Sequence, residues 1–204
     1  MGVVWLDAAS AERTLLGGKG ANLVALRQAG LPVPPAFILP PQLALEAVHG
    51  SEPARREVAD AWRRLTEGGR PVAVRSSALA EDAPDASFAG QFETVLGVAS
   101  VEELWAAIER CVASEREQHA EAYREAFRAA SRGMAVIVQE LVDARAAGVA
   151  FTVDPASGSD HVVVEAVRGL GDALVAGTAA GDRWEFARPG LESVARPEHP
   201  TALS

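Results

Sequence analysis

Residues 17–39 read GGKGANLVALRQAGLPVPPAFIL, and this stretch decides the fold of the first part of the chain. The glycine cluster at residues 17–22 predicts a turn whose backbone amides can approach an anion. Residues 22–30 have apolar side chains at helical spacing (Leu23, Leu26 and Ala29) and end at Gly30, which predicts a short helix. The proline-rich residues that follow predict an extended strand. A glycine-rich turn, a helix and then a strand indicate an α/β protein.

Lys19 lies inside this glycine cluster and is the only lysine among the 19 lysine and arginine residues of the chain. A lysine ammonium is a compact charge on a flexible stem, and it contacts a phosphate differently from a planar guanidinium. The spacing G-x-x-x-x-G-K-[ST] of a Walker A loop is absent. Two interpretations remain: the cluster is a structural turn that caps a helix, or Gly18 and Lys19 bind a phosphate.

Arg75 follows a short apolar run in VAVRSSALAED, residues 72–82. The pattern predicts a buried strand over residues 72–74 that opens into a polar loop. A charge at the exit of a buried strand needs a partner or a ligand. Arginine can contact phosphate oxygens through two nitrogens. The structural alternative is an ion pair with a nearby acid, for which the sequence offers Glu81, Asp82 and Asp85.

Two further segments have features that a nucleotide site needs. SFAGQFET, residues 87–94, combines small residues with hydroxyl and amide groups, and such a loop can cover a triphosphate or simply connect strands. VIVQELV, residues 136–142, is an apolar strand that becomes polar at Gln139 and Glu140. A strand that ends in a hinge can offer one backbone acceptor and one backbone donor to adenine, although most such strands are only core.

Composition limits the function classes. The chain has 204 residues, of which 49% are hydrophobic, which is enough for one large domain or two small lobes. A net charge of -9 gives no broad basic surface, so nucleic acid is not an expected partner. No apolar run reaches the roughly 18 residues of a membrane span, and no signal peptide is evident at the N-terminus. We therefore expect a cytoplasmic protein with no membrane partner.

The sequence shows no convincing nucleophile. Cys111 is the single cysteine, and its helical surroundings predict a buried thiol. Ser76 and Ser77 are expected to cap and orient the loop after Arg75, because none of the four histidines lies in a suggestive motif.

Four blocks in this order carry a resemblance to a known family: GGKGANLVALRQAGLPVPPAFIL, VAVRSSALAEDAPDASFAGQFETVLGV, VIVQELVDARAAGVAFTVDPASG and VEAVRGLGDALVAGTAAGDRWEF. They resemble the N-terminal nucleotide-binding part of phosphoenolpyruvate synthase, pyruvate phosphate dikinase and rifampicin phosphotransferase. The resemblance extends to about Phe186.

The resemblance implies an ATP-grasp-like fold of two lobes with mixed sheets that holds ATP and Mg²⁺ in a cleft. It also implies that phosphate moves from ATP to a histidine on a separate swivelling domain, and then to pyruvate, phosphoenolpyruvate or rifampicin. Lys19 and Arg75 would hold the phosphates and are the predicted catalytic residues. The predicted nucleotide-binding residues are Gly18, Lys19, Arg75, Gly90, Gln91, Thr94, Gln139, Glu140, Leu141 and Val142.

The sequence departs from the family pattern in two places. Asp172 stands in GLGD where the family usually has GLGE. The family's acidic metal-binding segment, its phosphohistidine domain and its acceptor-substrate domain are not in this sequence. We therefore expect an incomplete ATP-binding domain over residues 1–186 and a proline-rich tail or connection over residues 187–204.

No metal ligand is assigned. Asp154 and Glu165 lie at predicted strand ends and are the first candidates, with a structural role as the alternative for each.

Three functional hypotheses follow. The first is the ATP-binding part of a larger ATP-dependent phosphotransferase, in which case the isolated chain should bind ATP weakly and transfer no phosphate. The second is a non-catalytic nucleotide-binding or partner-docking protein derived from that family. The third is an α/β domain without a nucleotide. The downstream sequence of the gene would distinguish the first two.

Overall fold

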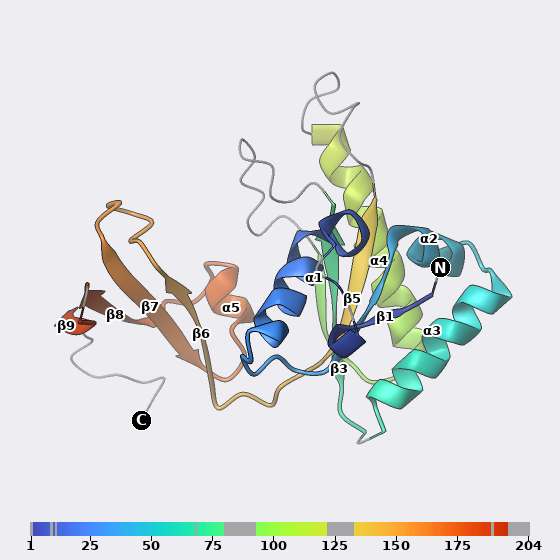
Figure 1. Ribbon diagram of the computed structural model, residues 1–204, viewed down its shortest axis with the longest axis horizontal. Coiled ribbons are helices and arrows are strands. Elements are labelled where there is room, and N and C mark those ends of the chain that lie inside the picture. Colours follow the sequence, from blue (N-terminus) through green and yellow to red (C-terminus); the bar gives the residue numbers. More distant parts are fainter. Residues whose placement is uncertain are drawn as a thin grey trace. The chain divides into compact units, whose positions relative to one another are not determined.

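The computed structural model describes residues 2–8, 10, 12–67, 69–79, 93–121, 133–188 and 190–195 (Figure 1). The chain divides into two compact units, unit 1 (Met1–Leu141) and unit 2 (Val142–Ser204), and each contains a sheet of its own. Within the described residues, no helix combines the length and the apolar character that crossing a membrane requires.

Unit 1 contains a five-stranded sheet in the order β1-β2-β5-β3-β4, in which every neighbouring pair is antiparallel. Its strands are β1 (Val4–Trp5), β2 (Ala36–Leu39), β3 (Val72–Ala78), β4 (Thr94–Val98) and β5 (Met134–Glu140). The first six residues of the central strand β5 are all buried. A nearly continuous apolar run of this kind is what a strand covered on both faces requires.

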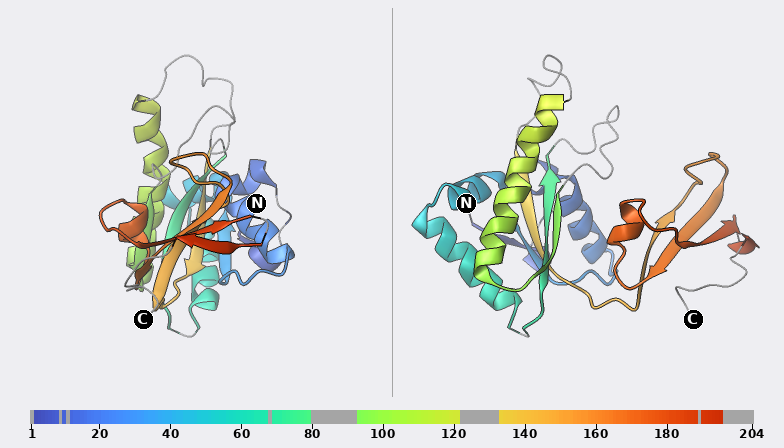
Figure 2. Two further views of the ribbon diagram at one scale, coloured as in Figure 1. Left: turned by 90° about the vertical axis from the view of Figure 1, so that its left-hand side faces the viewer. Right: turned by 180° about the vertical axis from the view of Figure 1, so that it is seen from behind.

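Helices cover both faces of this sheet (Figure 2). On one face, Val74, Val136 and Val138 pack in a core with the helices α2 (Pro41–Val48), α3 (Glu52–Leu65) and α4 (Val101–Glu121). On the other face, Ala135 and Ile137 pack with α1 (Arg13–Gln28) and the short 3₁₀ helix η1 (Leu6–Ala8). The second of these faces is called the α1 face.

Unit 2 contains a four-stranded antiparallel sheet in the order β6-β7-β8-β9. Its elements are β6 (Ala146–Phe151), β7 (His161–Arg168), the helix α5 (Asp172–Val175), β8 (Asp182–Ala187) and β9 (Glu192–Ala195). A Cβ atom added to Gly148 on β6 would lie 2.3 Å from the carbonyl oxygen of Glu165 on β7. A side chain at position 148 would therefore collide with the backbone of β7.

The predicted α/β class is confirmed, but the expectation of mixed sheets is wrong, because every strand pair in both sheets is antiparallel. An apolar run predicts that a segment is a buried strand, but it does not fix the direction of the neighbouring strand. Direction is decided by which strands become neighbours after folding.

The end of the chain also differs from the prediction. The sequence predicted a proline-rich tail or connection over residues 187–204, whereas residues 192–195 form β9, in which Ser193 pairs with Phe186 of β8. Four residues are too few for an alternating pattern to stand out among the surrounding prolines and glycines.

Candidate functional site

Arg75 and Thr94 lie side by side on the α1 face of the unit 1 sheet. Arg75 is directly opposite Thr94 on β4 and opposite Ile137 on β5, and direct cross-strand partners share a face. Ile137 packs with α1, whereas Val74, the residue before Arg75, packs on the opposite face. Thr94 is exposed and Arg75 is half-buried. This face therefore presents a guanidinium and a hydroxyl next to each other.

The glycine cluster lies on the same face, within helix α1. The sequence predicted a turn before a helix, but α1 already begins at Arg13 and is broken inside by Gly17, which has φ 70° and ψ 174°. A Cβ atom on Gly17 would lie 2.3 Å from the carbonyl oxygen of Ser77 on β3. The break places the turn of Gly18, Lys19 and Gly20 directly against β3.

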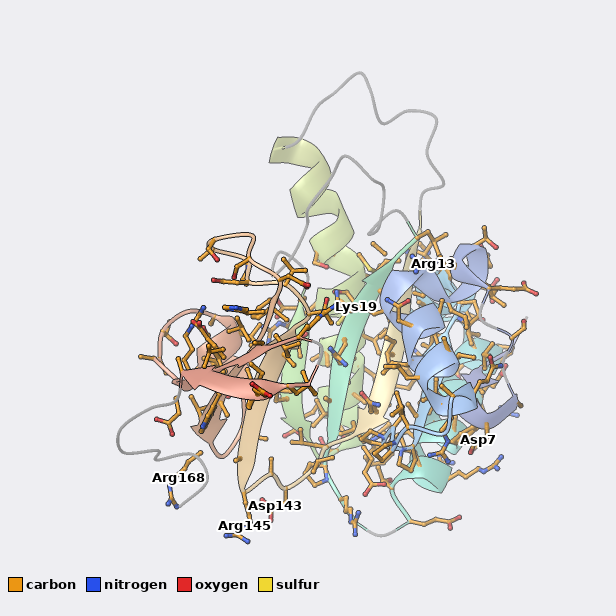
Figure 3. The ribbon with its side chains drawn as sticks, turned by 60° about the vertical axis from the view of Figure 1, so that its left-hand side comes forward. Asp7, Arg13, Lys19, Asp143, Arg145 and Arg168 are labelled. Atoms are coloured by element: carbon orange, nitrogen blue, oxygen red, sulfur yellow. The ribbon has the colours of Figure 1, made fainter. Side chains whose placement is uncertain are left out.

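Lys19 is half-buried at this turn, and Figure 3 shows its place on α1 together with Arg13 near the start of the same helix. Helix α1, which carries Lys19, packs against β3, and β3 pairs with β4. Lys19, Arg75 and Thr94 thus come from three elements that meet on the α1 face.

Arg75 is not at a strand exit, as the sequence predicted, but is the fourth residue of the seven-residue strand β3. Its Nη1 donates to the Gln139 Oε1 of β5 at 3.4 Å, and the Gln139 Nε2 donates to the carbonyl oxygen of Pro34 at 3.2 Å. Gln139 is nearly buried. Arg75, predicted to bind phosphate, is therefore in contact with Gln139, the first residue of the predicted adenine hinge.

Some backbone N–H groups of the predicted adenine hinge already form hydrogen bonds within the protein. The Glu140 N–H donates to the carbonyl oxygen of Pro35, and the Leu141 N–H donates to that of Pro71, both at 2.9 Å. The Glu140 carboxylate forms an ion pair with Arg70. Val142 is exposed, and its N–H forms no backbone hydrogen bond with the described residues. Sequence reasoning did not find these proline carbonyls, because their positions follow from the pairing of β5 with β2 and β3.

Two of the predicted site residues, Gly90 and Gln91, lie outside the described residues, as do Glu81, Asp82 and Asp85, the acids considered as partners of Arg75. Thr94 is the last residue of the predicted phosphate-covering loop, residues 87–94, and lies within the described part of the chain. The residue before it is fixed to β3, because the Ser76 hydroxyl donates to the carbonyl oxygen of Glu93 at 2.9 Å. The sequence predicted that Ser76 and Ser77 cap and orient the loop after Arg75, but both lie within β3. Residues 80–92 of that loop are outside the described residues, so its orientation stays a prediction. The Ser77 hydroxyl bonds to α1 instead.

In unit 2, Asp154 and Glu165, the candidate metal ligands, are both bound to Arg183. The Arg183 Nη1 lies 3.0 Å from the Glu165 Oε1 and Nη2 lies 3.3 Å from the Asp154 Oδ1, while Nε donates to Glu185 at 3.0 Å. Among the described residues, no group of three or more histidine, cysteine, aspartate or glutamate side chains is arranged to hold a metal ion. Both carboxylates are thus engaged by the Arg183 guanidinium, which gives each of them a structural role.

Asp154 organises the turn between β6 and β7. Its carboxylate accepts hydrogen bonds from the Ser157 hydroxyl at 2.6 Å and from the Ala156 N–H at 3.0 Å. These bonds, together with Arg183, lower the pKa of Asp154 from 3.8 to about 2. Hydrogen bonds to the charged form favour that form.

The lowered pKa of Asp154 predicts an acid-sensitive unit 2. Because the folded-state pKa of about 2 lies below the unfolded value of 3.8, the stabilisation is fully present above about pH 4 and is lost as the pH falls through 2. Asp154→Asn should remove this acid dependence, measured as the loss of amide NMR signals of His161–Arg168 between pH 5 and 2. Asp160→Asn, at an exposed acid of the same unit, is the control and should behave like the wild type. Equal acid midpoints for the wild type and Asp154→Asn would contradict the prediction.

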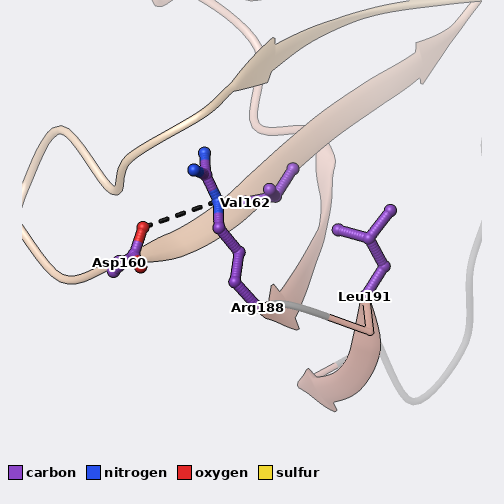
Figure 4. A pocket seen from close by; sticks show the side chains of 4 residues that line it. All are labelled: Asp160, Val162, Arg188 and Leu191. Atoms are coloured by element: carbon purple, nitrogen blue, oxygen red, sulfur yellow. Dashed lines mark ion pairs between the residues drawn. The ribbon is translucent and has the colours of Figure 1, made fainter.

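A surface hollow in unit 2 contains none of the predicted site residues. It is lined by Asp160, Val162, Arg188 and Leu191 (Figure 4). The Arg188 Nε lies 3.5 Å from the Asp160 Oδ1, and the Arg188 guanidinium also donates to the carbonyl oxygen of Thr152. Asp172, the departure from the family's GLGE, is exposed at the start of α5.

The fold and the site define the class of this protein. A layered α/β unit with a glycine-broken helix, a lysine, an arginine and a threonine on one sheet face has the features of a nucleotide-binding domain. The family model described as "Pyruvate phosphate dikinase, AMP/ATP-binding domain" matches residues 42–201, a range that contains Arg75, Thr94 and the hinge but not Lys19.

Curated relatives agree with this match. The chain is 36% identical to a probable phosphoenolpyruvate synthase of Methanothermobacter thermautotrophicus, covering 83% of the chain and 31% of the relative. It is 33% identical to the phosphoenolpyruvate synthase of Aeropyrum pernix, in an alignment that covers 93% of this chain and 29% of the relative. It is 37% identical to the prodigiosin synthesizing transferase PigC of Serratia marcescens, in an alignment that covers 85% of this chain and 22% of the relative. The chain therefore spans less than a third of the length of these relatives.

The chain belongs to the pyruvate phosphate dikinase AMP/ATP-binding domain family. It is an ATP/AMP-binding domain of the type found in phosphotransferases related to phosphoenolpyruvate synthase.

Proposed function

We propose that unit 1 binds ATP on the α1 face, with Lys19 and Arg75 on the phosphates and residues 139–142 on the adenine. The observation that carries this proposal is the meeting of the glycine turn of α1 with the β3 segment that bears Arg75. Two cations and the amino end of a helix segment give a positive potential where a triphosphate needs one.

The hinge geometry supports a definite division of roles. The N–H groups of Glu140 and Leu141 are already bonded, so the donor to an adenine ring nitrogen would be the N–H of Val142. The backbone carbonyl of Glu140 is proposed as the acceptor of the adenine amino group. Gly90, Gln91 and Thr94 are proposed to belong to the segment that covers the phosphates, and Gly18 to the turn that receives them.

We propose that the bound ATP supplies a phosphoryl group to a histidine on a separate domain, and through it to pyruvate or a similar acceptor. Lys19 and Arg75 would neutralise the charge that develops on the moving phosphoryl group, which is the main requirement of phosphoryl transfer. Mg²⁺ would be the usual companion of ATP in such a reaction. Among the described residues Asp154 and Glu165 pair with Arg183, and no step is assigned to the ion.

Titration calorimetry with a slowly hydrolysed ATP analogue tests the proposed site. Lys19→Ala and Arg75→Ala should each weaken binding by about 1–3 kcal/mol, which is roughly 5- to 150-fold in affinity, as expected for a lost charge-assisted hydrogen bond. Arg63→Ala is a matched control, because Arg63 is an exposed arginine on α3 that pairs with Asp60. It should leave the affinity unchanged.

Two outcomes would contradict this assignment. If the analogue binds the Lys19→Ala and Arg75→Ala variants as tightly as the wild type, the site lies elsewhere. If Arg75→Ala sharply lowers the melting temperature without nucleotide, the contact of Arg75 with Gln139 is structural. The transfer step is tested separately, with γ-labelled ATP and a histidine-bearing acceptor domain. Binding without acid-labile labelling of that domain would favour a non-catalytic nucleotide-binding protein.

A further inference from the structure

Helix α1 has an interrupted hydrogen-bond ladder at Gly17. In a continuous α-helix the N–H of Gly20 would donate to the carbonyl oxygen of Leu16, four residues earlier. The left-handed conformation of Gly17 separates these two groups. Both groups are buried, and a buried backbone group without a partner is strongly unfavourable.

The hydroxyl of Ser77 takes the place of the missing helical hydrogen bond. The Gly20 N–H donates to the Ser77 Oγ at 3.0 Å, and the Ser77 hydroxyl donates to the carbonyl oxygen of Leu16 at 2.8 Å. A side chain inserted into the helical ladder is one of the recognised causes of a kink. Ser77 also caps the segment that starts after Gly17, as a serine N-cap does, but from a strand more than 50 residues away.

The space at this contact admits only a small side chain. Ser77 is fully buried, and a Cβ atom on Gly17 would lie 2.4 Å from the Ser77 Oγ. Alanine at position 77 would remove both hydrogen bonds, while a larger residue would collide with the turn. The hydroxyl therefore sets the distance between β3 and the residues around Lys19.

We propose that Ser77 is a positioning residue of the nucleotide site, which holds Lys19 in register with Arg75 by keeping α1 open at Gly17. This inference rests on the proposed ATP site. Ser77 and Arg75 lie two residues apart on the same face of β3, so one strand fixes both the guanidinium and the turn that carries the ammonium. Ser77 itself has no contact with the phosphates in this role.

Ser76 provides a matched control. It is also a fully buried serine of β3, but it faces the opposite side of the sheet and its hydroxyl donates to the Glu93 carbonyl oxygen. Ser76→Ala and Ser77→Ala both remove buried hydroxyl bonds and should both lower the melting temperature. Only Ser77→Ala should disturb Lys19.

The first measurement needs no nucleotide. Lys19 is the only lysine, so reductive methylation with ¹³C-formaldehyde labels one side chain besides the N-terminal amine. In Ser77→Ala the Lys19 methyl signal should shift or split, whereas in Ser76→Ala it should stay at the wild-type position. An unchanged signal in Ser77→Ala would overturn the proposal even if ATP binds elsewhere.

The second measurement separates positioning from general loosening of the fold, and uses unlabelled protein. Ser77→Ala should weaken binding of the ATP analogue about tenfold, but should leave the affinity for adenosine unchanged. In the Lys19→Ala background, Ser77→Ala should cause no further loss, because its effect passes through Lys19. The proposal would be overturned if Ser77→Ala weakened the binding of adenosine as much as that of the ATP analogue. It would also be overturned if the double variant lost as much affinity as the two single variants together. If the wild type binds no nucleotide, the proposed function fails, while the methyl spectra still decide whether Ser77 sets the position of Lys19.

Discussion

Gly17→Ala should destabilise unit 1 by about 2–5 kcal/mol and weaken ATP binding with it. The added Cβ would lie 2.3 Å from the backbone oxygen of Ser77, a contact that cannot be relieved by rotating a side chain. Overpacking of this kind typically destabilises by about 1–3 kcal/mol, and a left-handed conformation adds roughly 1–2 kcal/mol for a residue with a side chain. For a unit of this size the melting temperature should fall by on the order of 10 °C.

Gly30→Ala separates the two contributions. Gly30 also has a positive φ, 79°, but nothing lies within 4 Å of its added Cβ. It should therefore show only the conformational part of the effect, about 1–2 kcal/mol, with unchanged nucleotide affinity. Calorimetric unfolding of the three proteins measures the difference. Equal stability of Gly17→Ala and Gly30→Ala would mean that the glycine turn does not pack on β3 as described.

Alkaline pH should destabilise unit 1 through Cys111. Burial of the thiol, followed by the nearby charge of Glu93, raises the pKa of Cys111 from 9.0 to about 12. Above pH 9 the unfolded chain loses this proton while the folded chain retains it, so the stability falls as the pH rises. The slope should approach about 1.4 kcal/mol per pH unit once the unfolded thiol is ionised, which amounts to roughly 2 kcal/mol between pH 9 and 11.

Cys111→Ala provides the reference for this measurement. It lacks the titrating thiol but keeps every other ionisable group, so the difference between the two pH slopes isolates Cys111. Urea unfolding followed by tryptophan fluorescence at pH 9, 10 and 11 reports mainly on unit 1, which contains Trp5, Trp62 and Trp105. If the unfolding free energies of the two proteins fell equally with pH, the thiol would ionise as readily in the folded chain as in the unfolded chain, which would contradict the prediction. The same burial should make the folded protein slow to react with thiol reagents.

Local patterns in the sequence predicted several elements well. The apolar run before Gln139 correctly indicated the buried central strand β5, and the helical surroundings of Cys111 correctly indicated a buried thiol. Both predictions depend only on neighbours in the chain. The helix before Gly30 was also found, although Leu26, expected on its apolar side, is 42% exposed, while Val24 is fully buried.

Predictions that depended on distant segments were less successful. Arg75 was expected at the exit of a short strand, because its charge and the serines after it are atypical of a core. In the structure, pairing with β5 extends β3 to Ala78, so Arg75 lies inside the strand. Its guanidinium contacts the Gln139 side chain of β5, a residue 64 positions away that local sequence could not indicate.

The sequence by itself determined the family, the glycine cluster with its single lysine, and the apolar run of the buried strand β5. These properties follow from residue identity and from periodicities of a few residues. Only the tertiary structure decided that the cluster is a broken helix and that a serine of β3 completes its hydrogen bonds. It also decided that Arg75 and Thr94 share the α1 face and that Arg183 binds the candidate metal acids. The physical reason is that each of these depends on a polar group or a close approach supplied from elsewhere in the chain, and strand pairing fixes which residues meet.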